Sequence, residues 1–268
     1  MRIFALLLIV AASGGQAPAG DLLAQARQRY NAREYDDAIR LADEARSDPA
    51  IAHAASVVVA RARLERFRQT SEPEDLNAAR EALVSVDASK LSPRDQVEYL
   101  VGQGEALYFS EPPRFGAAAE FFETALVRTG SADLAEREII FEWWAAALDR
   151  QGQLGPETER RFIYTRLLTG AEEERRRFDM SAVAWFWIAV GARGVDDLER
   201  AWGVAQAGWI RAGQLGNRGV ALRADLDRLV TQVLIPERAK QQTPGGDPRE
   251  AVTELEQQWI ELKKLWGG

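Results

Sequence analysis

Apolar residues recur at intervals of three and four positions along almost the whole chain from Asp21 onward. This is the spacing of one face of an α-helix, whereas the strict alternation typical of a half-buried strand is absent. In the first segment large and small apolar residues follow one another in a fixed order, and a similar order returns around 100–126, 141–168 and 185–209. Helical hairpins that recur in this way stack into solenoids. The pattern therefore predicts an all-α fold built from antiparallel helix pairs.

Proline, glycine and capping residues mark where these helices begin and end. Ser71 and Glu74 have the spacing of a capping box, and Pro93 and Pro248 lie where a proline just inside a helix start costs no hydrogen bond. The glycines typical of helix ends are Gly152, Gly170 and Gly194. Together these signals predict helix pairs over about 21–48, 51–88, 93–129, 132–169 and 180–212, a single helix near 218–241 and a last helix over about 248–266.

Small residues at fixed places let paired helices approach closely, and large residues fill the space between neighbouring pairs. The first three pairs carry this order at Leu22, Ala26, Tyr35, Ala38, Ala45, Leu76, Ala79, Leu83, Leu100, Gly104, Leu107, Phe115, Ala118, Phe122 and Ala125. The last two pairs carry it at Phe141, Trp144, Ala145, Leu148, Gly152, Leu154, Trp185, Ile188, Ala189, Ala192, Leu198, Ala201, Ala205 and Gly208. In this spacing the chain resembles the tetratricopeptide repeat, a helix–turn–helix unit of about 34 residues. The resemblance covers most of residues 21–212 and implies a right-handed α-α solenoid.

The resemblance also implies a function, that of a non-catalytic scaffold or adaptor. Its concave side, formed by the first helix of each pair, would bind a protein or peptide partner. The family's groove positions fall in this sequence on Arg27, Tyr30, Asn31, Glu98, Glu105, Tyr108, Glu142, Asp149, Arg150, Phe186 and Arg193. This mixture of aromatic and charged side chains suits a peptide segment that has both apolar and charged groups.

The last predicted helix has an unbroken apolar stripe at Val252, Leu255, Trp259, Leu262 and Trp266. Acidic residues lead this helix and two lysines close it, in agreement with the helix dipole. The linker before it, residues 241–247, is too short to carry the helix far. We therefore expect the helix to lie against the helix near 218–241 and to cap the solenoid, with Leu255, Trp259 and Leu262 buried. Docking of the stripe on a partner or on a second copy is the alternative.

The first residues are typical of an export signal. Arg2 precedes a short apolar run from Ile3 to Ala12, well below the roughly 20 residues that span a bilayer, and Ala17-Pro18-Ala19 fits a cleavage site before Gly20. We therefore expect a periplasmic or secreted protein with no stable membrane insertion after signal removal. The expected organisation is a signal peptide over 1–19, helical repeats over 20–212, a C-terminal repeat helix over 213–242, and a linker with a capping helix over 243–268.

Composition excludes several kinds of site. With 34 basic and 41 acidic residues the net charge is −7, which disfavours binding to nucleic acid. The chain has no cysteine, and its single histidine, His53, lacks the partners that a metal site or a catalytic base needs. Gly213, Gly216 and Gly219 stand between two predicted helices, which favours a turn over a phosphate-binding loop. The run Glu172–Arg177 predicts ordinary surface ion pairs. We expect no catalytic residue, metal or cofactor.

Six of the eight tryptophans lie between Trp143 and Trp209. Adjacent helical residues point about 100° apart, so Trp185, Phe186 and Trp187 cannot all face one neighbour. Such residues serve either the core or a binding groove. A Trp-lined pocket would fit an alternative function, an accessory ligand-binding component of an envelope transport system. A second alternative, an enzyme of cell-wall or glycan chemistry, would need two carboxylates that converge in one cleft.

Overall fold

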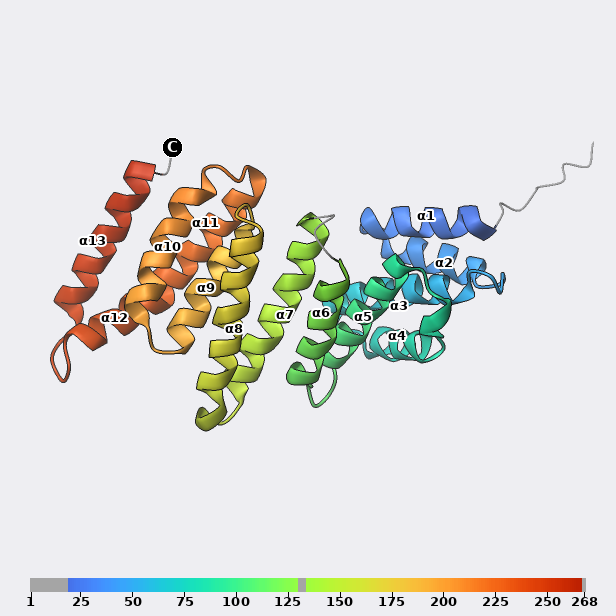
Figure 1. The fold of residues 1–268 in the computed structure, drawn as a ribbon, viewed down its shortest axis with the longest axis horizontal. Coiled ribbons are helices and arrows are strands. Elements are labelled where there is room, and N and C mark those ends of the chain that lie inside the picture. The colour runs from blue at the N-terminus through green and yellow to red at the C-terminus, as the bar shows by residue number, and fades with distance from the viewer. Residues whose placement is uncertain (1–18, 130–133, 267–268) are drawn as a thin grey trace, which may run out of the picture. The chain divides into compact units, whose positions relative to one another are not determined.

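The computed structural model describes residues 19–129 and 134–266, and over these residues the chain forms helices and no strand (Figure 1). This confirms the predicted all-α class. The predicted signal peptide, residues 1–19, lies outside the described residues apart from Ala19, where the first helix begins. No helix in the described part of the chain has the length and the apolar character that are needed to cross a membrane.

The chain divides into two compact units, one up to Asp95 and one from Gln96. The first unit contains α1 (Ala19–Asn31), α2 (Tyr35–Ala45), α3 (Ala52–Thr70), α4 (Pro73–Val84) and the short turn η1 (Ala88–Lys90). The boundary falls within α5 (Pro93–Tyr108). The second unit continues with α6 (Phe115–Thr129), α7 (Leu134–Leu154), α8 (Glu157–Arg177), α9 (Ala182–Gly194), α10 (Leu198–Ala212), α11 (Asn217–Leu229), the π-helical turn η2 (Val230–Leu234), α12 (Ile235–Gln242) and α13 (Arg249–Trp266).

Helices that follow one another in sequence pack together within each unit, from α1 to α4 and from α6 to α11. In the second unit α9 also contacts both α7 and α11, so these three helices adjoin one another. Ala145 of α7 and Ala189 of α9 are fully buried, as their spacing predicts. Gly191 lets α9 lie close to α8, because a Cβ atom at this position would be only 2.9 Å from the Cα atom of Leu168. Small residues therefore set the helix separation in this unit.

Two of the three glycines that were expected to end helices lie inside them instead. Gly152 is within α7 and Gly170 within α8, which continues to Arg177. A Cβ atom at Gly152 would lie 2.8 Å from the Tyr164 ring, and a Cβ atom at Gly170 would collide with the Trp144 indole. These glycines make room for aromatic rings from a neighbouring helix. Only Gly194 closes its helix, α9.

The predicted capping box at Ser71 and Glu74 is wrong. Ser71 ends α3 in the left-handed region with φ 60°, and α4 begins behind Glu72, which makes no side-chain capping bond. A hydrogen-bonded cap occurs instead at Ser92, whose Oγ accepts from the Asp95 N–H at 3.2 Å and donates to Asp95 Oδ2 at 2.7 Å. The capping-box spacing therefore predicted a side-chain cap that α4 does not have. A serine directly before Pro93 forms such a cap at the start of α5.

The last helix packs on its predecessors as expected. α13 contacts α12 and α10, and Leu255 and Trp259 are only 2% and 1% exposed. The Trp259 indole N–H donates to Asp227 Oδ1 of α11 at 2.8 Å, and Lys263 Nζ donates to the same oxygen at 2.7 Å. Leu262 is half-buried rather than buried. The expected covering of the preceding helices is therefore confirmed for two of the three side chains.

A buried ion pair replaces one of the surface pairs expected in Glu172–Arg177. Glu174 of α8 is 3% exposed, and its carboxylate accepts from Arg137 of α7 through Nε at 2.9 Å and Nη2 at 2.8 Å. Arg137 also donates to the Leu126 carbonyl at 2.7 Å, and its guanidinium lies 4.9 Å from the centre of the Phe178 ring. The prediction of a solvated face is therefore wrong at Glu174, because its partner lies on another helix.

Candidate functional site

The predicted groove residues of the first unit are mostly engaged within the protein. Arg27 donates to Asp95 at 2.6 Å, and the Tyr30 hydroxyl accepts from Arg61 at 2.9 Å. Asn31, at the end of α1, is exposed. Two of these three side chains thus hold α1 against other parts of the unit. His53, the single histidine, accepts at Nδ1 from the Asp87 N–H at 3.1 Å, a structural contact between α3 and the chain after α4.

The predicted residues of α5 differ in their accessibility. Glu98 is half-buried, whereas Glu105 is only 1% exposed and does not belong to the accessible surface. Tyr108 is half-buried in an aromatic cluster, with ring centres 4.9 Å from Phe115 and 5.2 Å from Trp143. The groove positions inferred from the resemblance therefore include one residue, Glu105, that a partner does not reach in this structure.

The predicted residues of α7 are exposed or half-buried. Glu142 and Arg150 are exposed and Asp149 is half-buried. Asp149 accepts from the Tyr164 hydroxyl at 2.8 Å and from Gln153 at 2.7 Å. Burial raises the pKa of Tyr164, and the neighbouring Asp149 carboxylate raises it further. Tyr164 therefore acts at neutral pH as a protonated donor that fixes Asp149.

Glu142 carries the most distinctive electrostatics of the predicted residues. Its Oε2 accepts from the indole N–H of Trp187, a 5% exposed residue of α9, at 2.8 Å. Desolvation raises the pKa of this carboxyl, the Trp187 hydrogen bond opposes the shift, and the Asp225 carboxylate of α11 adds to it. Neighbouring protein atoms therefore disfavour the charged form of a carboxyl that solvent still reaches.

Phe186 and Arg193 complete the predicted set on α9. Phe186 is half-buried and contacts Trp187 edge to face, with ring centres 5.1 Å apart. Arg193 is half-buried and holds Glu237 of α12 through Nη2 at 2.7 Å and Nε at 2.9 Å. Arg193 and Glu237 line an open recess of about 520 Å³ together with Gln153, Arg160, Tyr164, Gly194, Asp196, Leu198 and Lys240. Arg193 is thus committed to an internal ion pair at the edge of this recess.

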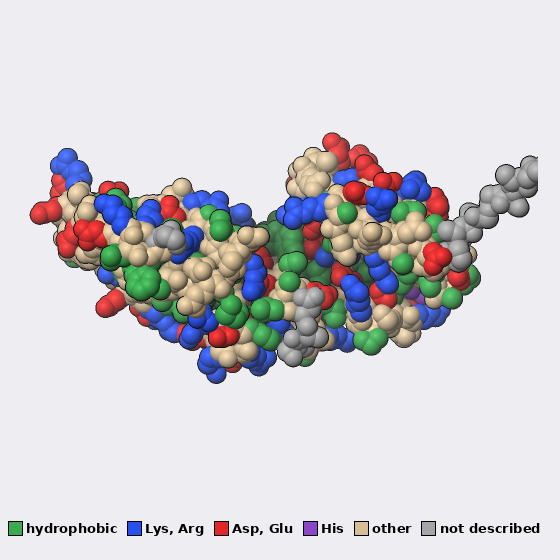
Figure 2. Space-filling view, turned by 90° about the horizontal axis from the view of Figure 1, so that it is seen from above, with side chains coloured by type: hydrophobic (Ala, Val, Ile, Leu, Met, Phe, Trp, Pro, Cys, Tyr) green, Lys and Arg blue, Asp and Glu red, His purple; other side chains and the backbone are tan. Residues whose placement is uncertain are grey.

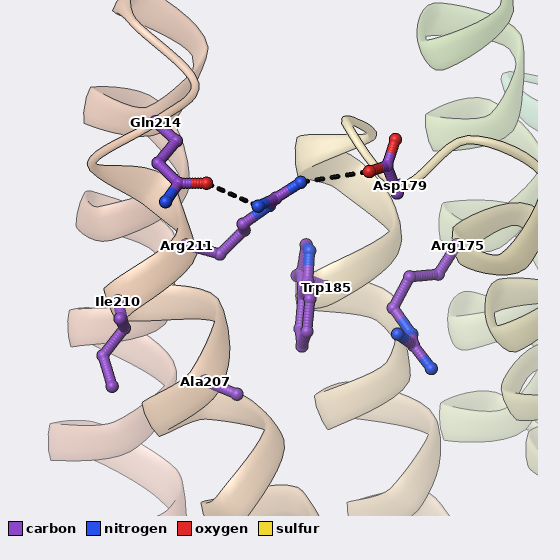
Figure 3. Close-up of a pocket in the computed structure, with 7 residues that line it drawn as sticks. All are labelled: Arg175, Asp179, Trp185, Ala207, Ile210, Arg211 and Gln214. Atoms are coloured by element: carbon purple, nitrogen blue, oxygen red, sulfur yellow. Dashed lines mark hydrogen bonds and ion pairs between the residues drawn. The ribbon is translucent and has the colours of Figure 1, made fainter.

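The structure divides the Trp185-Phe186-Trp187 run as helical geometry requires. Trp187 is in the core and Phe186 is half-buried beside it, whereas Trp185 is half-buried on another side of α9, against α10. There it lines a recess of about 500 Å³ with Arg175 of α8, Asp179 of the following loop, Ala207, Ile210 and Arg211 of α10, and Gln214 of the turn after α10 (Figure 3). We call this the Trp185 recess. The helical spacing named for this segment, at Leu198, Ala201, Ala205 and Gly208, did not indicate the α10 residues that line the recess.

The described surface shows no concentration of metal-binding groups. No three His, Asp or Glu side chains of the described residues gather in a way that could hold a metal ion. In Figure 2 basic and acidic side chains are interspersed over the face that is drawn, with apolar side chains in small groups between them. Both accessible features, the Glu142 surface and the Trp185 recess, combine aromatic rings with charge.

No protein-family model matches the chain, and no curated protein or solved structure matches it either.

Proposed function

We propose that the chain is an exported, non-catalytic adaptor that holds a protein or peptide partner on one face of a right-handed, tetratricopeptide-like solenoid. In this proposal α7 and α9 are the first helices of antiparallel pairs, α11 is the repeat helix that follows, and α13 is the cap. The direct contacts of α9 with both α7 and α11 support a common layer for these helices. The proposed binding surface, the first-helix face, consists of Ile139, Glu142, Phe186 and Asp225.

The observation that carries the proposal is the state of Glu142. Its carboxylate is accessible and hydrogen-bonded to Trp187, yet no basic side chain of the described residues pairs with it. A desolvated carboxylate is stabilised when a cation approaches it, and aromatic rings nearby favour the same cation. Ile139, 58% exposed and one turn before Glu142, adds an apolar contact. The face therefore suits a peptide in which arginine or lysine stands beside apolar residues.

The alternative, an accessory ligand-binding component for envelope transport, would rest on the Trp185 recess. Trp185 is the one tryptophan among the residues that line it, and the recess is open to solvent rather than enclosed. An enclosed, Trp-lined cavity would have favoured the transport function. The open, mixed surface at Glu142 favours the adaptor.

Selection from a displayed library of random peptides tests the proposal. We expect the selected peptides to combine basic and apolar residues, and Glu142→Gln to weaken their binding about tenfold, since a hydrogen bond to a charged group is worth ~1.5–3 kcal/mol. Fluorescence anisotropy with labelled peptides measures the dissociation constants. Glu256→Gln, at an exposed position on α13, is the matched control and should leave binding unchanged. Selected peptides that bind Glu142→Gln and Phe186→Ala as well as the original protein would contradict the proposal.

The same binding should depend on pH in a way set by Glu142. Because desolvation raises the pKa of this carboxyl, its negative charge is lost at a higher pH than for an ordinary glutamate, which titrates near ~4.3. Peptide affinity should therefore fall on acidification before other carboxylates titrate. In Glu142→Gln this early phase should be missing. Titrations of both proteins across the mildly acidic range make the comparison, and identical profiles would show that Glu142 does not contact the peptide.

A further inference from the structure

We propose that the Trp185 recess is a second binding site, specific for a singly charged carboxylate carried on an apolar group. It lies on a different side of α9 from Trp187, the partner of Glu142, and it does not depend on the adaptor function. Its volume of about 500 Å³ is within the range of small-molecule sites. The chemistry of its lining determines the class of ligand.

The recess presents a cation that the protein does not neutralise. Arg175 makes no ion pair with a described residue, and its guanidinium lies 5.1 Å from the centre of the Trp185 ring. Arg211 faces it across the indole and donates to Asp179 Oδ2 at 3.2 Å (Figure 3). Asp179 is largely exposed, with a side chain 81% accessible, so this pair is weak. Two guanidinium groups and one carboxylate leave the recess with a single net positive charge.

A hydrogen-bond donor in the recess lacks an acceptor. The Trp185 indole N–H is buried and has no hydrogen-bond partner among the described residues. In Figure 3 the indole is seen edge-on with its nitrogen end toward Arg211, whose guanidinium donates to Gln214 Oε1 and to Asp179 Oδ2, so the indole N–H is the donor that lacks an acceptor. A buried donor without an acceptor is unfavourable. A carboxylate placed beside the indole nitrogen would supply the missing acceptor, next to the positive charge of Arg211.

The remaining lining explains the apolar part of the ligand. Ala207 and Ile210 of α10 form an apolar wall beside the indole ring. Gly208 lets α10 approach, because a Cβ atom at this position would lie 3.2 Å from the Cβ atom of Trp185. A single positive charge matches a carboxylate better than a doubly charged phosphate. The ligand is either a small free acid or the C-terminal carboxylate of a peptide, and both present the same chemistry.

Nuclear magnetic resonance of the indole N–H groups in the full chain tests this inference. The probes are hexanoate and its neutral isostere hexanamide, titrated into protein labelled with ¹⁵N-tryptophan. We expect hexanoate to move the Trp185 indole proton downfield in a saturable way, because a new hydrogen bond deshields it, and hexanamide to leave it in place. The Trp144 and Trp209 indole groups are internal controls, since they too are buried without an acceptor but lie outside the recess.

Matched arginine variants then locate the charge that binds. Arg175→Gln should weaken hexanoate binding about fivefold, as expected for the loss of one ion pair that solvent reaches. Arg176→Gln is the control, because Arg176 is the next residue of α8 and is exposed outside the recess. Both variants leave the core untouched. Equal affinities for the two variants would overturn the assignment of Arg175.

A second pair of probes identifies the source of the carboxylate. A short peptide ending in leucine with a free C-terminus is compared with the same peptide as its C-terminal amide. A shift of the Trp185 signal by the free peptide alone assigns the site to peptide C-termini, and a shift by hexanoate assigns it to small acids. No shift with any carboxylate, or equal shifts with the amides, would overturn the inference.

Discussion

Replacing Glu174 by glutamine is expected to lower the free energy of unfolding of the second unit by about 3–5 kcal/mol. The substitution leaves the Arg137 guanidinium, 6% exposed, without the carboxylate that accepts from its Nε and Nη2. Removal of one partner of a buried ion pair is costly because the other charge stays in a medium that solvates it poorly. Urea denaturation followed by tryptophan fluorescence measures the loss.

The fluorescence signal is well suited to this purpose. All eight tryptophans lie beyond Gln96, so they report on the second unit. Glu173→Gln is the matched control, since Glu173 is the preceding residue, is exposed, and pairs with Arg176 at 3.8 Å. Its effect should stay within about 0.5 kcal/mol. The double variant Arg137→Met/Glu174→Leu should recover most of the loss, because it removes both charges. A single Glu174→Gln variant as stable as the control would show that the pair is solvated.

The helices could be predicted from the sequence because their signal is local. Apolar spacing of three and four predicted the succession of helices, although α8 runs to Arg177, beyond the end expected near 169, and the same spacing placed Ala145 and Ala189 in the core. Glycine was ambiguous, since the same residue ends a helix at Gly194 and admits an aromatic ring at Gly170. Whether a glycine ends a helix or makes room for a ring depends on a residue of another helix. The local sequence pattern does not contain that residue.

The candidate sites depend on such distant pairs even more strongly. Glu174 is part of a run that resembles surface charges, and only Arg137, 37 residues away, makes it a core residue. Glu142 was predicted from its groove position, but its hydrogen bond to Trp187 is a property of the packing of α7 and α9. The Trp185 recess combines residues from α8, α9 and α10 and from the connections that follow α8 and α10. Sequence periodicity identified the apolar and polar faces of these helices. It could not identify which residues of other helices those faces contact.

Replacing Trp259 by alanine is expected to lower the free energy of unfolding of the second unit by about 3–5 kcal/mol, the usual effect of removing a buried tryptophan. Trp259 is 1% exposed, and its ring centre lies 5.2 Å from that of Trp209 and 6.0 Å from that of Trp202, both of α10. The substitution removes these contacts and the hydrogen bond to Asp227. Because this one residue joins α13 to both α10 and α11, its loss should also loosen the helix as a whole.

Trp266→Ala is the matched control, since Trp266 belongs to the same helix and is 52% exposed. It should change the free energy of unfolding by well under 1 kcal/mol. Truncation after Gln242 should destabilise at least as strongly as Trp259→Ala and should promote self-association, because it exposes the apolar surface that Leu255 and Trp259 cover. Urea denaturation measures the free energy of unfolding of the three variants, and sedimentation measures their self-association. If the truncated chain stayed monomeric with an unchanged urea midpoint, α13 would be a detachable docking element, and its apolar stripe would replace the first-helix face as the leading candidate for partner binding.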